Sequence, residues 1–400
     1  MSWLSNYLLT LVILLKIGIL SDFFHPRSGG IAVHIEQLSK YLKKRGHEPV
    51  IITTAGCDAG LEKYNRICVI RFPASVSKNL LFPNLKLERK IQYILDQLDF
   101  DLLNAHHAFS PMGIYTSKMG QILNIPSILT NHSIPMGFAY YKFIWARVAK
   151  LLSTYTILRS LSRYERVIAV SKIAAEFIRY FNKNRVTIIP NGVDLEEFKI
   201  KGYKEEFGLK EEDPLLIMVG RSTLKKGYEV GLLTLRWILK RFPRAKLFIT
   251  GVNGVIRSYI YGLAKVFGVA KAVKIPGFLP REKLIKLYWA SDVLLHFPYG
   301  GESFGIVLLE AMASETPIVA THGDGLQYIL NGSGSGFVSY SYDPRKLANL
   351  VIKILESEEL KRRLGRAGRK IAEYYSWNRI VDKVIAVYKE AIENYKQVRF

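Results

Sequence analysis

The sequence is poor in cysteine, in long apolar runs and in basic tails, and each shortage excludes a class of protein. Two cysteines in 400 residues rule out a disulfide scaffold, and the spacing of Cys57 and Cys68 matches no zinc pattern. No apolar run reaches the ~20 residues that span a bilayer. Residues 1–15 lack a basic leader and a small-residue cleavage site, so we expect an apolar extension or an interfacial anchor there, and no signal peptide.

Acidic side chains are also scarce. The chain has 57 lysines and arginines against 34 acidic residues, a net charge of +23. This balance favours an anionic partner, such as a phosphorylated small molecule or a membrane surface. Because there is no polybasic tail, a nucleic-acid partner is not expected.

One stretch of the chain contains no acidic residue at all: no Asp or Glu occurs from Leu102 to Tyr164. Within it, residues 137–163 are aromatic, basic and helical in pattern. They fit either an interfacial helix on anionic lipid or a core helix with a solvated basic face. We therefore expect a cytoplasmic protein, peripheral to the membrane if this stretch binds lipid.

Apolar strand patterns alternate with helical patterns along the chain, in two runs separated near Pro190–Asp194. This alternation predicts an α/β protein of two facing doubly wound, Rossmann-like domains, over 16–192 and 193–378. Ligands of such sheets bind beyond the carboxyl ends of the strands, so we expect the active site in a cleft between the domains.

The segment 298–313 combines a strand end, a glycine-rich loop and an apolar helix that we expect to open near Ser303. The first amides of a helix lack internal partners and favour an anion, so a phosphate is expected on Gly305, Ile306 and Val307. Glu302 and Glu310 would flank it, roughly 12 Å apart along the helix axis. Carboxylates repel phosphate, so they are expected to bind hydroxyl groups.

Two further loops follow strands. Gly220–Gly227 carries Arg221 and Lys226, which are suited to phosphate oxygens, although alone it would read as a solvated basic loop. Gly29 and Gly30 allow close approach of backbone to a ligand. The triplet Asp99–Asp101 precedes a strand, on the wrong sheet edge for a catalytic cation.

Histidines close two strands of the first domain. His106 and His107 end one, and His132 ends another; together with His25 they are candidates for contacts to sugar or acceptor. No carboxylate stands near them in sequence, so we expect no metal.

These motifs resemble the retaining family-four glycosyltransferases. The Glu302 and Glu310 pair resembles the family's Glu-x7-Glu signature, and Gly220-Arg221 with Lys226-Gly227 is similar to its donor-diphosphate loop. The order of Gly29-Gly30, His106, Pro190–Asp194, Gly277–Leu279 and Tyr375–Trp377 also matches. The first half is most similar to the catalytic subunit of phosphatidylinositol N-acetylglucosaminyltransferase, on Ser21–Pro26, Ala108–Ser110 and His132-Ser133.

The resemblance implies a GT-B fold whose last helix, about 379–400, crosses back onto the first domain. It implies a metal-independent hexosyltransferase that moves a sugar with retention from a nucleotide-diphosphate donor to a lipid, lipid-linked or glycan hydroxyl, without any cofactor. Arg221 and Lys226 would stabilise the leaving diphosphate, Glu302 would bind the donor sugar, and Glu310 the ribose. His106, or His107 in its place, would reach the reacting sugar. The implied donor-side residues are Gly29, Gly30, Gly277, Phe278, Leu279, Phe304, Gly305, Ile306 and Val307, and the acceptor-side candidates are His25, His107 and His132.

Two other functions fit parts of this pattern. A nucleotide-sugar 2-epimerase would share the fold and the donor site. A basic membrane- or nucleic-acid-binding protein with a degenerate site would not need the intact set Arg221, Lys226, Glu302 and Glu310, so the sequence favours it less.

Overall fold

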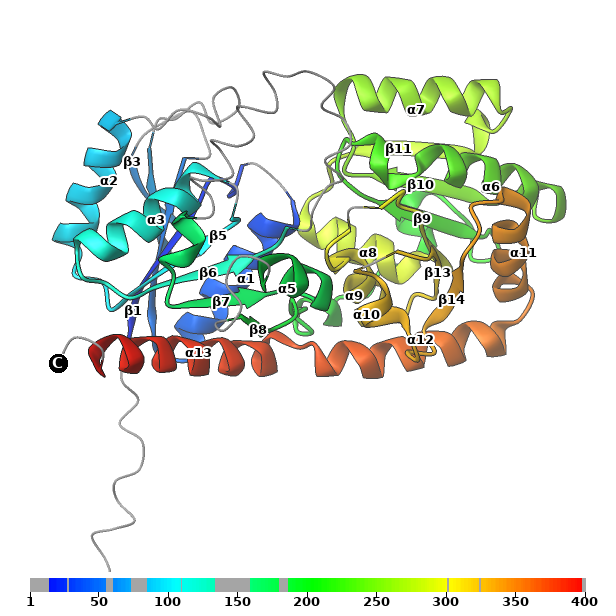
Figure 1. The fold of residues 1–400 in the computed structure, drawn as a ribbon. Coiled ribbons are helices and arrows are strands. Elements are labelled where there is room, and N and C mark those ends of the chain that lie inside the picture. The colour runs from blue at the N-terminus through cyan, green and yellow to red at the C-terminus, as the bar shows by residue number, and fades with distance from the viewer. Residues whose placement is uncertain are drawn as a thin grey trace, which may run out of the picture.

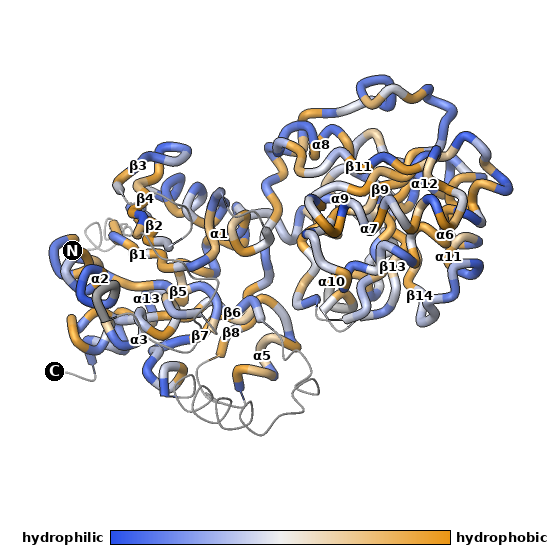
Figure 2. The backbone as a smooth tube through the Cα atoms, turned by 90° about the horizontal axis from the view of Figure 1, so that it is seen from above, coloured by the Kyte–Doolittle hydropathy of each residue, from blue (hydrophilic) through white to orange (hydrophobic). Residues whose placement is uncertain are grey.

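The protein is built from two lobes, each a parallel β-sheet covered by helices (Figure 1). The structure, a computed structural model, describes residues 14–26, 29–54, 60–72, 85–108, 110–133, 159–179, 186–300, 302–323 and 325–397. Most strands of the two sheets are apolar and buried (Figure 2). The architecture is α/β with two Rossmann-like lobes, as the alternating pattern predicts.

The first lobe contains an eight-stranded sheet of order β3-β4-β2-β1-β5-β6-β7-β8. Its strands are β1 (Lys16–Ser21), β2 (Glu48–Thr53), β3 (Gly60–Tyr64), β4 (Ile67–Arg71), β5 (Leu102–His106), β6 (Ser127–Asn131), β7 (Arg166–Ala169) and β8 (Val186–Ile188). All neighbours pair in parallel except β3 with β4. Strand β3 is not predicted by the sequence, because it is an exposed edge strand without an apolar face.

The helices of this lobe are α1 (Gly30–Lys44), α2 (Leu85–Gln97), α3 (Pro111–Ile122) and α5 (Lys172–Arg179). Helix α1 buries Ile35, Leu38 and Leu42, the apolar positions that its period of 3.6 brings to one face. Helix α3 begins where Ser110 accepts from the Gly113 amide and Pro111 occupies the first turn. These two helices start at the carboxyl edge of the sheet, where the candidate residues lie.

The second lobe contains a six-stranded parallel sheet of order β11-β10-β9-β12-β13-β14. Its strands are β9 (Leu215–Val219), β10 (Lys246–Thr250), β11 (Val273–Gly277), β12 (Val293–His296), β13 (Ile318–Thr321) and β14 (Gly336–Ser339). Its helices are α6 (Tyr228–Arg241), α7 (Gly254–Val266), α8 (Arg281–Ala290), α9 (Ile306–Ala313), α10 (Gln327–Leu330), α11 (Pro344–Leu355) and α12 (Glu358–Tyr374). Short 3-10 helices lie at Glu197–Lys199, Lys204–Phe207, Leu224–Lys226 and Ala270–Ala272.

The last helix, α13 (Trp377–Gln397), returns to the first lobe and runs beneath its sheet (Figure 1). Trp377 is buried against Gly192, where an added Cβ would lie 2.7 Å from the indole, so only glycine fits there. Arg45, which follows α1, binds Asp382 of α13 at 2.8 Å. The chain thus crosses between the lobes twice, near Gly192 and near Trp377.

Two segments expected to meet lipid fall largely outside the described residues. These are the apolar extension, apart from Leu14 and Leu15, and the basic aromatic stretch up to residue 158. Among the described residues, no helix combines the length and apolarity that crossing a bilayer requires.

Candidate functional site

The two lobes approach each other where the loop after β1 faces the loop after β9 and the start of α9. An added Cβ at Gly29 would lie 3.2 Å from the Arg221 Cδ atom, and one at Gly30 would lie 3.3 Å from the Ile306 Cδ1 atom. Side chains at 29 and 30 would therefore crowd the facing lobe. The sequence-predicted glycine pair thus stands opposite the predicted cationic loop.

An ion pair lies at the centre of the donor-side residues. Lys226 Nζ donates to Glu302 Oε2 at 2.7 Å, and both side chains are about four-fifths buried. Burial alone would raise the pKa of Glu302, but the charges of Lys226 and Arg221 more than offset it, so that pKa lies below its ordinary value. Glu302 is therefore ionised at neutral pH and can only accept hydrogen bonds.

His296 closes β12 behind this pair and is a residue that the sequence reasoning missed. Within the described part of the chain, its buried Nε2 atom has no hydrogen-bond partner. Burial and the charge of Lys226 lower its pKa to about 4, so the ring is neutral. Its place at a strand's carboxyl end is the signal that singled out His106 and His132, and it could have identified His296 too.

Helix α9 begins later than the sequence predicts. It starts at Ile306 rather than Ser303, because Gly305 adopts a left-handed conformation with φ of 84°. Glu302 lies before the helix, as the sequence predicts, but it is too far from the helix start for the expected separation of the two glutamates along one helix axis to apply. The amides of Ile306 and Val307 are at the helix start, the position suited to an anion.

Glu310 is buried on α9 and is bound by two residues of α8. Arg281 Nη1 donates to Glu310 Oε1, and the Tyr288 hydroxyl donates to Oε2 at 2.9 Å. The sequence predicts a partner for this carboxylate because of its apolar surroundings, but it does not identify these residues. Both pairings join positions more than 20 residues apart.

The two adjacent histidines at the end of β5 point to different surroundings. His107 has a φ of 85° and its ring centroid lies 5.0 Å from that of Phe23. Burial and the charge of Arg221 lower its pKa to about 4, so His107 lies within the influence of the opposite lobe. His106 is fully buried and faces the first lobe's interior.

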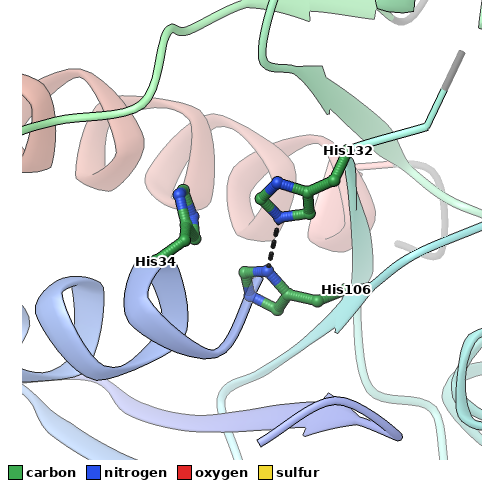
Figure 3. A group of neighbouring side chains, drawn as sticks. All are labelled: His34, His106 and His132. Carbon is green, nitrogen blue, oxygen red and sulfur yellow. Dashed lines mark hydrogen bonds between the residues drawn. The ribbon is translucent and has the colours of Figure 1, made fainter. Parts of the chain in front are cut away.

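His106 instead forms a cluster with His34 of α1 and His132, which follows β6 (Figure 3). His106 Nδ1 lies 3.1 Å from His132 Nε2, and His34 Nδ1 donates to Asn191 Oδ1 at 2.7 Å. The ring of His34 also packs against Trp377, with centroids 5.1 Å apart. The cluster thus joins α1, two strand ends and the crossover helix.

The same cluster offers one ring nitrogen from each histidine, and these lie within 4.8 Å of one another. A tetrahedral zinc ion with bonds of about 2.1 Å needs nitrogens about 3.4 Å apart. Two of the rings already hydrogen-bond each other. The arrangement therefore fits a structural hydrogen-bonded group better than a coordination sphere.

The other candidates lie on both sides of the site. Gly277 has a φ of 81° and Phe278 is exposed, whereas the Leu279 and Phe304 side chains are buried in the core. Phe304 could therefore meet a donor only through its backbone. On the first lobe, His25 binds Glu36 at 2.9 Å.

Comparison with known proteins agrees with the family that the sequence motifs resemble. Residues 28–197 match the family described as Glycosyltransferase Family 4, and residues 199–371 match Glycosyl transferases group 1. The chain is 29% identical to an uncharacterized glycosyltransferase, MJ1607, of Methanocaldococcus jannaschii, with 95% of this chain and 99% of that protein covered. It is 27% identical to phosphatidyl-myo-inositol mannosyltransferase of Mycobacterium tuberculosis, over 94% and 97% of the two chains.

Among solved structures, sucrose-phosphate synthase from Thermosynechococcus elongatus superposes with a TM-score of 0.78 at 21% identity, over 95% of this chain and all of that one. This likeness extends through both lobes and supports the GT-B architecture. Because the two family matches together cover both lobes, and the fold agrees with them, the protein is a glycosyltransferase of the GT-B fold.

Proposed function

We propose that the protein is a retaining, metal-independent glycosyltransferase that transfers a sugar from a nucleotide-diphosphate donor to a hydroxyl group of a lipid or lipid-linked acceptor. The observation that carries this proposal is the Lys226–Glu302 pair close to the start of α9. It places a cation that can bind the diphosphate beside an ionised carboxylate that can accept hydrogen bonds from sugar hydroxyls.

The leaving diphosphate is stabilised by Lys226, Arg221 and the first amides of α9. These groups supply positive charge where negative charge develops, which is the contribution that a divalent cation makes in other transferases. Glu302 accepts from a donor-sugar hydroxyl. The same-face mechanism implied by the family resemblance uses a leaving phosphate oxygen to take the acceptor's proton.

His107 is the histidine that we assign to the donor sugar, in place of His106. The reason is geometric: His107 packs against Phe23 of the loop after β1, which faces Arg221 at Gly29, whereas His106 faces the interior. A neutral ring can donate to a sugar hydroxyl without repelling the cations nearby.

The acceptor is proposed on two grounds. The mycobacterial relative is named for a phosphatidyl-myo-inositol acceptor, and the first half resembles a transferase that also acts on phosphatidylinositol. The net charge of +23 suits an anionic membrane surface. We therefore infer a phosphoinositide-like lipid acceptor and peripheral binding to the membrane.

A thermal-shift panel of UDP-, GDP- and ADP-sugars identifies the donor, because a ligand that binds only the folded protein raises its melting temperature. The stabilising donor is then incubated with phosphatidylinositol vesicles, and the organic phase is analysed for glycolipid. An anomer with the donor's configuration supports the proposal. An epimer formed from donor alone would instead indicate a 2-epimerase, and activity lost on treatment with chelator would contradict metal independence.

A further inference from the structure

The carboxylate of Glu310 is held by two donors that leave half of its accepting capacity open. An ionised carboxylate has about four acceptor positions, two on each oxygen. Arg281 occupies one on Oε1 and Tyr288 one on Oε2. Counting donors from the described residues, one position remains on each oxygen, an arrangement that suits two neighbouring hydroxyl groups.

We propose that Arg281 and Tyr288 are positioning residues that present Glu310 to both hydroxyls of the donor's ribose, and so make the site selective for ribonucleotides over 2′-deoxyribonucleotides. This inference rests on the proposed function, which places the donor nucleotide in the second lobe. A 2′-deoxynucleotide would leave one oxygen of the carboxylate without its partner, and an unmade hydrogen bond to a charged group is costly.

Arg281 itself is held by two carboxylates. Its Nε atom lies 3.1 Å from Glu197 Oε2, while its Nη1 atom reaches Glu310, so one guanidinium bridges two carboxylates. Burial alone would lower the pKa of Arg281, but Glu310 and Glu197 outweigh it and raise that pKa. The guanidinium also lies 5.3 Å from the ring centroid of Phe198.

Glu197 is fixed in turn by helix α1 of the first lobe. Gln37 donates to its Oε1 atom at 2.7 Å, and Lys40 lies 3.3 Å from the same atom. The carboxylate that meets the ribose is therefore connected to the acceptor-side lobe through Arg281. A lysine at position 281 could not reproduce this, because an ammonium lacks the planar fork that spans two carboxylates.

Removing Arg281 leaves a buried carboxylate with one partner instead of two. Such a group is destabilised by its burial, so it turns away from its wild-type position. The match of its two oxygens to two hydroxyls is then lost. We therefore expect ribose selectivity, more than overall folding, to depend on Arg281.

The test measures binding of UDP, GDP, ADP and their 2′-deoxy forms to the full chain by titration calorimetry. We expect the wild type to bind its preferred ribonucleotide at least about tenfold more tightly than the 2′-deoxy form. In Arg281→Met the affinity for the ribonucleotide falls by a larger factor than that for the 2′-deoxy form, which has one hydroxyl contact to lose instead of two, so the two affinities approach each other. Arg281→Lys shows an intermediate ratio.

Two further variants keep the result interpretable. Lys286→Met removes a cation from the same helix, where it pairs with Glu206, and is expected to keep the wild-type ratio. Tyr288→Phe deletes a single hydroxyl and is expected to lower the ratio even if Arg281→Met does not fold.

An unchanged ratio in Arg281→Met and Tyr288→Phe would overturn the inference and leave the proposed function standing. Tighter ribonucleotide binding by Arg281→Met would overturn it too, because Arg281 would then block the carboxylate. If no nucleoside diphosphate bound the wild type, the proposed function and this inference would fail together.

Discussion

At the scale of single residues, the chemistry of the donor site depends on a few charges brought together from distant positions. Lys226 and Glu302 come from loops 76 residues apart and form one ion pair. The sequence identified both, because each follows a buried strand and stands beside glycines. It could not identify Arg281 and Tyr288, which lie on a helix that carries none of the motifs of the donor site.

The choice between His106 and His107 also could not be made from the sequence. Strand alternation puts His106 on the face covered by α1 and α13. His107 then has a positive φ of 85°, which breaks the alternation and directs its ring elsewhere. Only the structure shows that His107 packs against Phe23 of the loop that faces Arg221, whereas His106 joins the buried histidine cluster.

Removal of the diphosphate-binding cations should slow turnover. We expect Arg221→Ala and Lys226→Ala each to lower kcat at least about tenfold, equivalent to about 1.4 kcal/mol of barrier. Lys226→Ala also leaves Glu302 without its ion-pair partner. Initial rates at saturating donor provide the measurement, with Lys265→Ala on the exposed surface of α7 as the control. Wild-type turnover in both variants would contradict the assignment.

Buried neutral histidines should make the protein less stable in mild acid. Burial lowers the pKa of His34 to about 4, whereas in the unfolded chain it lies near 6.5. Between these values the unfolded state binds the extra proton, so the free energy of unfolding falls as pH falls below about 6.5. His34 alone contributes a slope of up to about 1.4 kcal/mol per pH unit.

Urea denaturation at several pH values between 7 and 4.5 measures this slope. The variant His34→Gln keeps a side chain able to bond Asn191 but has no titrating group. We expect the slope of its unfolding free energy against pH to be shallower than that of the wild type by the contribution of one titrating group. Equal slopes would show that His34 does not contribute to the pH dependence of stability.

At the scale of elements, the ends of helices and strands decide where the ligand groups stand. The sequence predicts most strands of both sheets, because buried parallel strands are continuous apolar runs. It misses β3 because Gly60–Tyr64 alternates in neither hydropathy nor burial. It places the start of α9 too early because nothing local reveals that Gly305 turns left-handed before the helix.

The loop between β1 and α1 can carry no bulky side chain where it approaches the second lobe. In Gly29→Ala the new methyl group would press on Arg221, and we expect kcat/KM to fall at least about threefold because the guanidinium is displaced. Gly262→Ala on α7 is the control, because nothing lies within 4 Å of an added Cβ there. A fully active Gly29→Ala protein with unaltered melting temperature would show that this approach is not critical.

At the scale of the whole molecule, the crossover of α13 ties the two lobes together. Trp377 packs against Gly192, His34 and Tyr41 at the point where the chain returns to the first lobe. The order of motifs in the family resemblance anticipates such a helix. Its contacts could not be anticipated, since they join residues hundreds of positions apart.

Loss of this indole should destabilise the protein strongly. We expect Trp377→Ala to lower the free energy of unfolding by about 3–5 kcal/mol, the usual cost of deleting a large buried aromatic side chain. Tyr374→Ala, at an exposed position three residues earlier, should cost little. Denaturant titration of both variants compares them, and similar small losses would mean that the crossover contributes little stability.

The return of α13 has a consequence for biosynthesis. The core that α13 shares with Ile17, Leu38 and Tyr41 includes Val381, Val384 and Tyr388. The strands and helices of the first lobe are therefore synthesised long before the helix α13 that covers part of their core. Until α13 has been translated, the nascent first lobe exposes an apolar surface, so we expect its folding to depend on chaperones. The second lobe can complete its core as soon as it leaves the ribosome.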